Sequence, residues 1–182
     1  QRTWRWPAAA LILLGALSPL GFTPPSLLVS GDGRQVALRT PEGTLWVASQ
    51  RGSRFVLDSW ARQGFATETV TWPRFGTAAG ERLSCDPLGC LYRQDGKVTA
   101  ILRDPRAAAD DCAQADVVVS LEPLRRQPCR GPAVVIDRFD LWRDGAQAVW
   151  LGPAGPRVET VAAQQGARPW SPYPARKAPW EK

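Results

Sequence analysis

Two amino acids are absent from this chain of 182 residues, histidine and methionine. Without histidine the chain cannot form a Ser-His-Asp or Cys-His catalytic centre, and it cannot bind a metal through imidazole. A Gly-x-x-x-x-Gly-Lys phosphate-binding loop is also absent, which argues against a P-loop enzyme. Because protein synthesis starts at methionine, we expect the chain to be the C-terminal piece of a longer membrane protein.

Charge is absent from residues 6–22, which are mostly apolar. These 17 residues lie at the short end of the length that spans a bilayer. We therefore expect residues 1–22 to end a membrane region, with a transmembrane helix over 6–22. A signal peptide is the alternative interpretation, because Arg2 and Arg5 precede an apolar core. Both interpretations keep these arginines in the cytoplasm and place residues 23–182 outside it.

The net charge of +6 is concentrated at the two ends of the chain. Two positive charges precede the apolar stretch, and the tail over 167–182 carries a net three. The body between them is nearly neutral, so it lacks the dense basic face of an autonomous nucleic-acid-binding domain. One local cluster contains Arg125, Arg126 and Arg130, which are candidate contacts for DNA phosphates. A solvated loop is the alternative interpretation of this cluster.

Four cysteines predict two disulfides in a domain outside the cytoplasm. Cys85 and Cys90 enclose a short loop with a proline and a glycine, and would form one pair. Cys112 and Cys129 would form the second pair. A zinc site built from all four cysteines is the alternative, but such sites use two pairs that are each close in sequence, and only one pair here is close.

Strand and helix patterns alternate along residues 23–166. Strands are expected over 27–30, 35–40, 44–49, 82–85, 90–94, 97–103, 116–121, 133–136, 147–151 and 157–162. Helices are expected over 53–64, 104–115 and 137–144, with an irregular loop over 65–80. This order predicts an α/β domain, an αββα-like sandwich of two sheets with helices outside. Recurrent prolines leave 167–182 as an extended, basic, Pro-rich tail.

Aromatic and acidic side chains add candidates for the core and for a metal site. The tryptophans at 46, 60, 72, 142 and 150 are expected in the core. Asp32, Asp86, Asp137 and Asp140 could bind a hard cation, and Asp137 and Asp140 would share one helix face. The alternative is that Asp137 caps the helix while Asp140 is solvated or pairs with Arg143. We favour this alternative because an acid at a helix start already has a structural role.

One segment, residues 134–151, resembles the C-terminal end of proteobacterial ComEC-type competence proteins; its sequence is VVIDRFDLWRDGAQAVWL. Three further segments fit the same family: LLVSGDGR over 27–34, the loop between Cys85 and Cys90, and DCAQADVVVS over 111–120. The resemblance covers most of residues 20–170. It is fairly specific over 136–151 and looser elsewhere.

The resemblance implies an inner-membrane channel that carries one DNA strand into the cytoplasm during natural transformation. This chain would supply its extracytoplasmic, periplasmic domain, with a metallo-β-lactamase-like fold. In intact members that domain carries a metal site rich in histidine and aspartate, which is proposed to degrade the other strand. This chain has no histidine, so the metal site is not carried over, and no catalytic residue, metal or cofactor is expected.

A degenerate, non-catalytic domain that scaffolds the channel or guides single-stranded DNA is the resulting expectation. Its expected partners are single-stranded DNA, the membrane and the channel region of the same polypeptide, with no small-molecule substrate. Two other functions stay open. One is a carboxylate-metal nuclease that uses Asp32, Asp137 and Asp140. The other is a membrane-anchored envelope domain that binds a protein through exposed aromatic residues, for which Trp170, Tyr173 and Trp180 are candidates.

Overall fold

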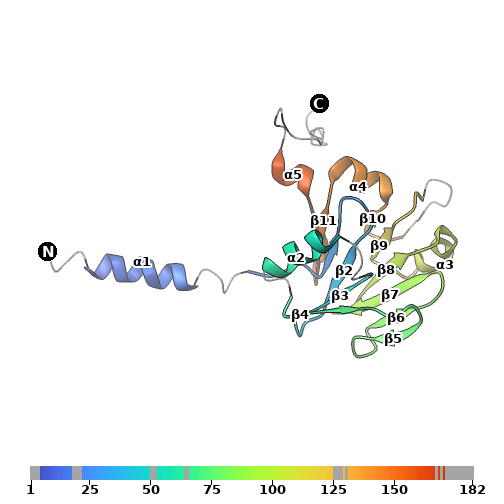
Figure 1. Ribbon diagram of the computed structural model, residues 1–182, viewed down its shortest axis with the longest axis horizontal. Helices are drawn as coiled ribbons and strands as arrows, with labels where there is room; N and C mark the ends of the chain where they lie inside the picture. The colour runs from blue at the N-terminus through green and yellow to red at the C-terminus, as the bar shows by residue number, and fades with distance from the viewer. Residues whose placement is uncertain are drawn as a thin grey trace.

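The computed structural model describes residues 5–17, 22–49, 53–63, 66–124, 129, 131–166, 168 and 170. Helix α1 (Arg5–Leu17) stands apart from the globular part of the chain in Figure 1. The globular part contains two six-stranded sheets and a few short helices. These helices are α2 (Arg54–Arg62), η2 (Pro105–Ala107), α3 (Ala108–Asp111), α4 (Arg138–Asp144) and α5 (Val161–Gln165). The chain is a mixed α/β protein, as its sequence predicts.

Helix α1 is shorter than the uncharged stretch over 6–22. It has 13 residues, which extend about 20 Å along a helix, whereas a hydrocarbon core is about 30 Å thick. The side chains of Leu11, Ile12 and Leu13 on α1 are largely exposed. Within the described residues, no helix is long and apolar enough to cross a membrane, so the expected transmembrane helix is not found.

Both sheets combine antiparallel and parallel pairs of strands. The first sheet has the order β12 (Gly155–Thr160), β11 (Gln147–Gly152), β1 (Leu27–Val29), β2 (Val36–Arg39), β3 (Thr44–Val47), β4 (Glu68–Thr71). The second has the order β10 (Val134–Ile136), β9 (Val117–Ser120), β8 (Lys97–Leu102), β7 (Gly89–Gln94), β6 (Leu83–Cys85), β5 (Gly76–Ala78). The parallel pairs are β3–β4, β8–β9 and β9–β10.

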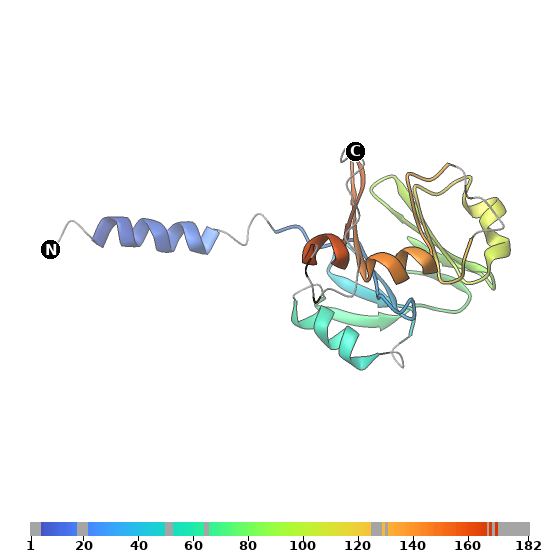
Figure 2. The same ribbon diagram turned by 90° about the horizontal axis from the view of Figure 1, so that it is seen from above.

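The two sheets pack face to face because successive side chains of a strand point to opposite faces. In β1, Leu27 and Val29 belong to the main core between the sheets, whereas Leu28 clusters with Trp60 of α2 on the outer face. On the second sheet, Val118 of β9 clusters with α3 on the opposite outer face. Figures 1 and 2 show α2 and α3 on opposite sides of the globular part. The layers are helix, sheet, sheet, helix.

Three helical segments have side-chain caps at the first residues of the helices expected over 53–64, 104–115 and 137–144. The side chain of Ser53 caps α2, and that of Asp104 caps η2. Asp137 caps α4 and forms a reciprocal capping box with Asp140, because each carboxylate accepts a backbone N–H of the other residue. The helix expected over 104–115 is shorter, since the chain forms a 3-10 turn and one turn of α-helix there.

Strands β4 and β5 lie in the segment over 65–80, where we expect an irregular loop, so that expectation is wrong. β4 is an edge strand that pairs in parallel with β3 after the α2 crossover. Each face of β4 is half-buried or exposed, so its sequence carries no apolar alternation for periodicity to detect. Helix α5 likewise begins at Val161, inside the last expected strand.

Both expected disulfides are present. Cys85 and Cys90 face each other across the β6–β7 pair, with Cα atoms 4.1 Å apart. Cys112, at the end of α3, forms the second disulfide with Cys129, and their Cα atoms are 5.4 Å apart. All four sulfurs are therefore bonded in pairs, and the alternative of a four-cysteine zinc site does not apply to this structure.

Candidate functional site

A cleft of about 480 Å³ opens between the two sheets at one edge of the sandwich. It lies where β3 and β4 of the first sheet and β8 and β9 of the second reach their carboxyl ends, because the residues that follow these strands line it. In α/β sheets, ligands bind outside the carboxyl ends of parallel strands. We call this hollow the edge cleft.

The floor of the edge cleft is apolar and rigidly held. Val36, Ile101 and Trp72 line it and are almost fully buried. Trp72 directly follows β4, and its backbone N–H donates to the carbonyl of Val47 at 3.1 Å, which extends the β3–β4 ladder by one step. The floor therefore belongs to the main core between the sheets.

The mouth of the edge cleft carries two arginines. The Arg103 guanidinium donates to the carbonyl oxygens of Arg74 at 3.0 Å and Asp86 at 2.9 Å. It also lies within hydrogen-bond distance of the Pro73 carbonyl and of Cys90 Sγ. All of these acceptors are neutral, so they fix the orientation of the guanidinium without neutralising its charge. Arg74 also lines the cleft, and it is exposed.

Neither of these arginines forms an ion pair within the described part of the chain. Other basic side chains do, among them Arg82, Lys97, Arg106, Arg143 and Arg157. None of the described residues that line the edge cleft carries a carboxylate. The cleft therefore offers uncompensated positive charge, which suits an anionic ligand.

An aromatic side chain stands beside these charges. Phe75 lines the cleft and is 63% exposed, whereas Trp72 forms the apolar floor. A solvent-exposed aromatic ring next to arginines can stack on a nucleic-acid base while the arginines contact phosphate. The segment from Trp72 to Phe75, Trp-Pro-Arg-Phe, places one arginine between two aromatic residues.

The candidate metal ligands serve the fold instead. Asp137 and Asp140 are occupied by the capping box, and Asp140 also pairs with Arg143 at 2.5 Å, as the structural alternative predicts. Asp32 accepts from Ser30 Oγ at 2.5 Å and from a backbone N–H two residues on. Burial alone would raise the pKa of Asp32, but these hydrogen bonds outweigh it and lower that pKa. No group of three or more potential ligands forms among the residues that the structure describes.

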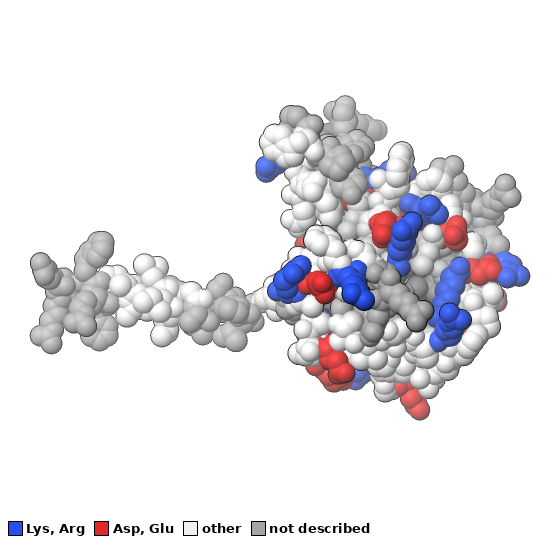
Figure 3. Space-filling model, viewed as in Figure 1, with Lys and Arg blue, Asp and Glu red and all other residues white. Residues whose placement is uncertain are grey.

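Other expected contacts fall in different places. Arg125, Arg126 and Arg130 lie outside the described residues, so their role as phosphate contacts stays a prediction. Asp86 accepts backbone N–H groups from Leu88 and Gly89 and shapes the small disulfide loop. On the face shown in Figure 3, basic and acidic side chains are interspersed, which agrees with a nearly neutral body.

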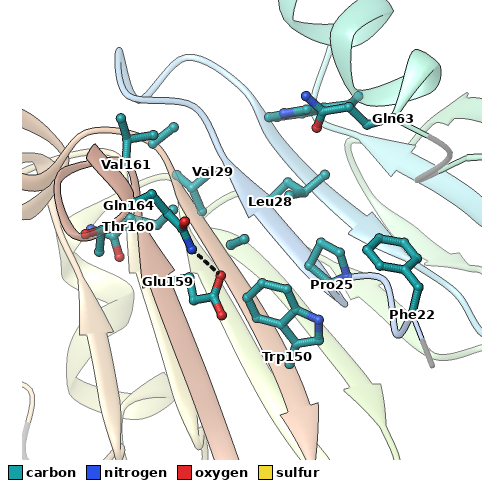
Figure 4. Close-up of a pocket in the computed structure, with 14 residues that line it drawn as sticks. Phe22, Pro25, Leu28, Val29, Gln63, Trp150, Glu159, Thr160, Val161 and Gln164 are labelled. Atoms are coloured by element: carbon teal, nitrogen blue, oxygen red, sulfur yellow. Dashed lines mark hydrogen bonds between the residues drawn. The ribbon is translucent and has the colours of Figure 1, made fainter. Parts of the chain in front are cut away.

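A second hollow of about 340 Å³ lies on the outer face of the first sheet, between α2 and α5. Leu28, Trp60 and Trp150 line it, and Figure 4 shows Leu28 and Trp150 together with Gln63 at the α2 rim and Gln164 at the α5 rim. We call this hollow the outer groove. It lies on the face of the first sheet that points away from the main core, the same face that α2 covers.

Comparison of the chain with protein-family models, with curated proteins and with solved structures found no match.

Sequence reasoning missed the residues of the edge cleft. Arg74 and Arg103 are 29 residues apart, and only the meeting of the two sheets brings them together. The signal that could have found half of the site is an arginine between two aromatic residues in the segment from Trp72 to Phe75. No local pattern distinguishes Arg103, which simply follows an apolar strand.

Proposed function

We propose that this chain provides the extracytoplasmic domain of an inner-membrane DNA-uptake channel, and that its edge cleft guides single-stranded DNA without cutting it. The observation that carries the proposal is the combination of Arg74, Arg103 and Phe75 at the cleft mouth, without a carboxylate among the described lining residues. Single-strand-binding proteins use the same combination, positive charge for the backbone and an aromatic platform for the bases.

The architecture supports the same proposal at the level of the fold. A degenerate metallo-β-lactamase-like domain would have helix, sheet, sheet and helix layers, and this chain has that order. Its hollow at the carboxyl ends of the strands is where an α/β fold places a ligand. The resemblance of residues 134–151 to ComEC-type proteins supplies the link to DNA uptake, and the exposed apolar side chains of α1 favour a membrane-facing attachment.

The donor set of the cleft favours guiding over hydrolysis. Metal-dependent nucleases hold their ions with carboxylate or imidazole ligands, often as a pair of metals. The chain has no histidine, and no carboxylate is found among the lining residues that the structure describes. A phosphodiester in this cleft would contact guanidinium groups and aromatic rings, which bind the strand and leave it intact.

The physical chemistry sets the expected strength of binding. Each phosphate neutralised on a single strand contributes about 0.7 to the magnitude of the slope of log affinity against log salt concentration. Two arginines therefore give a slope of about 1.4 in magnitude. Stacking of one base on Phe75 adds roughly 1–3 kcal/mol. The result is weak binding that depends strongly on salt, as suits a strand that must move through a channel.

The test is fluorescence anisotropy of labelled oligothymidylate with the full chain at several salt concentrations. Arg74→Ala should reduce the salt slope by about 0.7, and Phe75→Ala should weaken binding about tenfold with the slope unchanged. Arg82→Ala is the matched control, because Arg82 is paired with Glu42 at 2.7 Å. Equal losses for Arg74→Ala and Arg82→Ala would reject the cleft as the binding site.

The same samples test the absence of hydrolysis. The fraction of intact oligonucleotide after incubation with Mg²⁺ or Mn²⁺ should equal the fraction in EDTA. Metal-dependent cleavage that disappears on Asp32→Asn and on the double change Asp137→Asn with Asp140→Asn would instead indicate the carboxylate nuclease.

A further inference from the structure

The Arg103 guanidinium bridges the mouth of the edge cleft through contacts of unequal length. Its Nη1 atom donates to the carbonyl oxygens of Arg74 at 3.0 Å and Asp86 at 2.9 Å. Its Nη2 atom lies farther from its neighbours, 3.5 Å from the Pro73 carbonyl oxygen and 3.4 Å from Cys90 Sγ. Hydrogen bonds from nitrogen to oxygen are usually about 2.7–3.2 Å long. The Nη1 contacts therefore hold the group, whereas Nη2 can exchange a long contact for a phosphate oxygen.

The Asp86 carbonyl is oriented by a tight turn that the side chain of the same residue closes. Asp86 Oδ1 accepts the backbone N–H groups of Leu88 at 2.8 Å and Gly89 at 2.7 Å. The Asp86 N–H donates to the carbonyl of Gly89 at 2.9 Å. Aspartate side chains form such turns because their oxygens take the place of a backbone acceptor. The disulfide between Cys85 and Cys90 closes the base of the loop, so the turn is held at both ends.

The same loop also holds the backbone at Arg103. The N–H groups of Arg103 and Asp104 both donate to the carbonyl of Leu88, at 2.8 Å and 3.0 Å. Pro87, which lies between Asp86 and Leu88, lines the edge cleft. The turn at Asp86 is therefore part of the cleft wall, and it contacts Arg103 through both the backbone and the guanidinium.

We propose that Asp86 is a positioning residue of the edge cleft, which holds the Arg103 guanidinium in the orientation that contacts a DNA phosphate. This inference rests on the proposed function, because it concerns the same cleft. The Asp86 side chain is exposed, and a carboxylate near a DNA strand repels the phosphates. Charge alone therefore predicts that removing Asp86 strengthens binding. Positioning predicts the opposite result when the acceptor oxygen is removed.

The test measures the affinity of the full chain for labelled oligothymidylate by fluorescence anisotropy at several salt concentrations. Asp86→Ala should weaken binding about twofold or more, as expected for residues that share a hydrogen-bond network. It should also lower the magnitude of the salt slope by up to about 0.7, because the phosphate contact of Arg103 is lost. Asp86→Asn should bind at least as tightly as wild type, because an amide oxygen accepts the same N–H groups.

Two results with these variants would contradict the positioning role. Unchanged or tighter binding by Asp86→Ala would show that the residue acts through its charge alone. Binding by Asp86→Asn that is as weak as binding by Asp86→Ala would show that the acceptor oxygen does not matter.

A double-mutant cycle separates positioning from a general loss of structure. In the Arg103→Ala background, Asp86→Ala should cause no further weakening, and an additive loss would refute the coupling. Asp116→Ala is the matched control. The Asp116 carboxylate also accepts a backbone N–H, that of Val98 at 2.9 Å, but at the opposite end of β8 from Arg103. This variant should bind as wild type does, and a loss equal to that of Asp86→Ala would count against positioning.

The wild-type measurement distinguishes this inference from the proposed function. If wild type does not bind oligothymidylate, both are overturned. If wild type binds and Asp86→Ala binds equally well, only the positioning role is overturned.

Discussion

The disulfide between Cys112 and Cys129 is expected to stabilise the domain more than the one between Cys85 and Cys90. The first closes a loop of 17 residues and the second a loop of 5. In the chain-entropy description, loops of these lengths remove about 3 and about 2 kcal/mol, respectively, of denatured-state freedom. The backbone pairing of β6 with β7 also holds Cys85 opposite Cys90 without the bond, which widens the difference.

The assay compares the double variants Cys112→Ala with Cys129→Ala and Cys85→Ala with Cys90→Ala. Both variants replace two cysteines with alanines. The difference between their free energies of unfolding therefore reports the difference between the two disulfides. For a domain of this size, about 3 kcal/mol corresponds to a fall of roughly 6–12 °C in the melting temperature. Chemical denaturation under oxidising conditions measures the free energy of unfolding directly. An equal or larger loss for the Cys85 and Cys90 pair would refute this reasoning.

Three further predictions concern stability. Burial raises the pKa of Tyr92 to about 12, so the neutral phenol is favoured in the folded state, and stability is lost as pH rises from about 10 to 12. Over this range the free energy of unfolding of wild type should fall at most about 2 kcal/mol more than that of Tyr92→Phe, and parallel curves would contradict this. Asp137→Ala should cost about 1 kcal/mol in denaturant because the α4 cap is lost, whereas an unchanged midpoint would contradict the capping box. Gly89→Ala should cost more than about 1 kcal/mol because its Cβ would lie 2.7 Å from the Ile101 carbonyl oxygen. Gly152→Ala, with its nearest atom at 3.8 Å, should be tolerated as a control.

The sandwich could be anticipated because its central strands carry strong local patterns. β1 and β2 alternate between two buried faces, and β9 is a run of valines buried on both sides. Capping residues marked the starts of three helical segments, and cysteine spacing marked both disulfides. These signals are local, so a single sequence contains them.

Elements that depend on tertiary neighbours could not be anticipated. The edge strand β4 takes its place from β3 and the α2 crossover, and its own residues show little burial. Trp142 was expected in the core but is 76% exposed, because Leu141 takes the inward position of α4 and is 2% exposed. A tryptophan on a short helix carries no sign of which side faces the core.

The edge cleft shows the same limit for the site. Its arginines come from different sheets, and their meeting depends on how β4 and β8 end at the same edge of the sandwich. Residue type alone makes Asp137 and Asp140 candidate metal ligands, but their carboxylates accept backbone N–H groups in the capping box of α4. Whether an arginine has a carboxylate partner depends on the tertiary structure, so the sequence does not distinguish Arg74 and Arg103 from paired residues such as Arg82.

Photo-cross-linking of single-stranded DNA to the full chain tests the central claim most directly. Ultraviolet irradiation with oligothymidylate at low salt, followed by mass spectrometry, locates the residues that contact bases. We predict cross-links on the segment from Trp72 to Phe75, reduced by Arg103→Ala and lost on Phe75→Ala. Cross-links confined to other segments, such as the one from Arg125 to Arg130, or no cross-links at all, would contradict the edge cleft as the path of the strand.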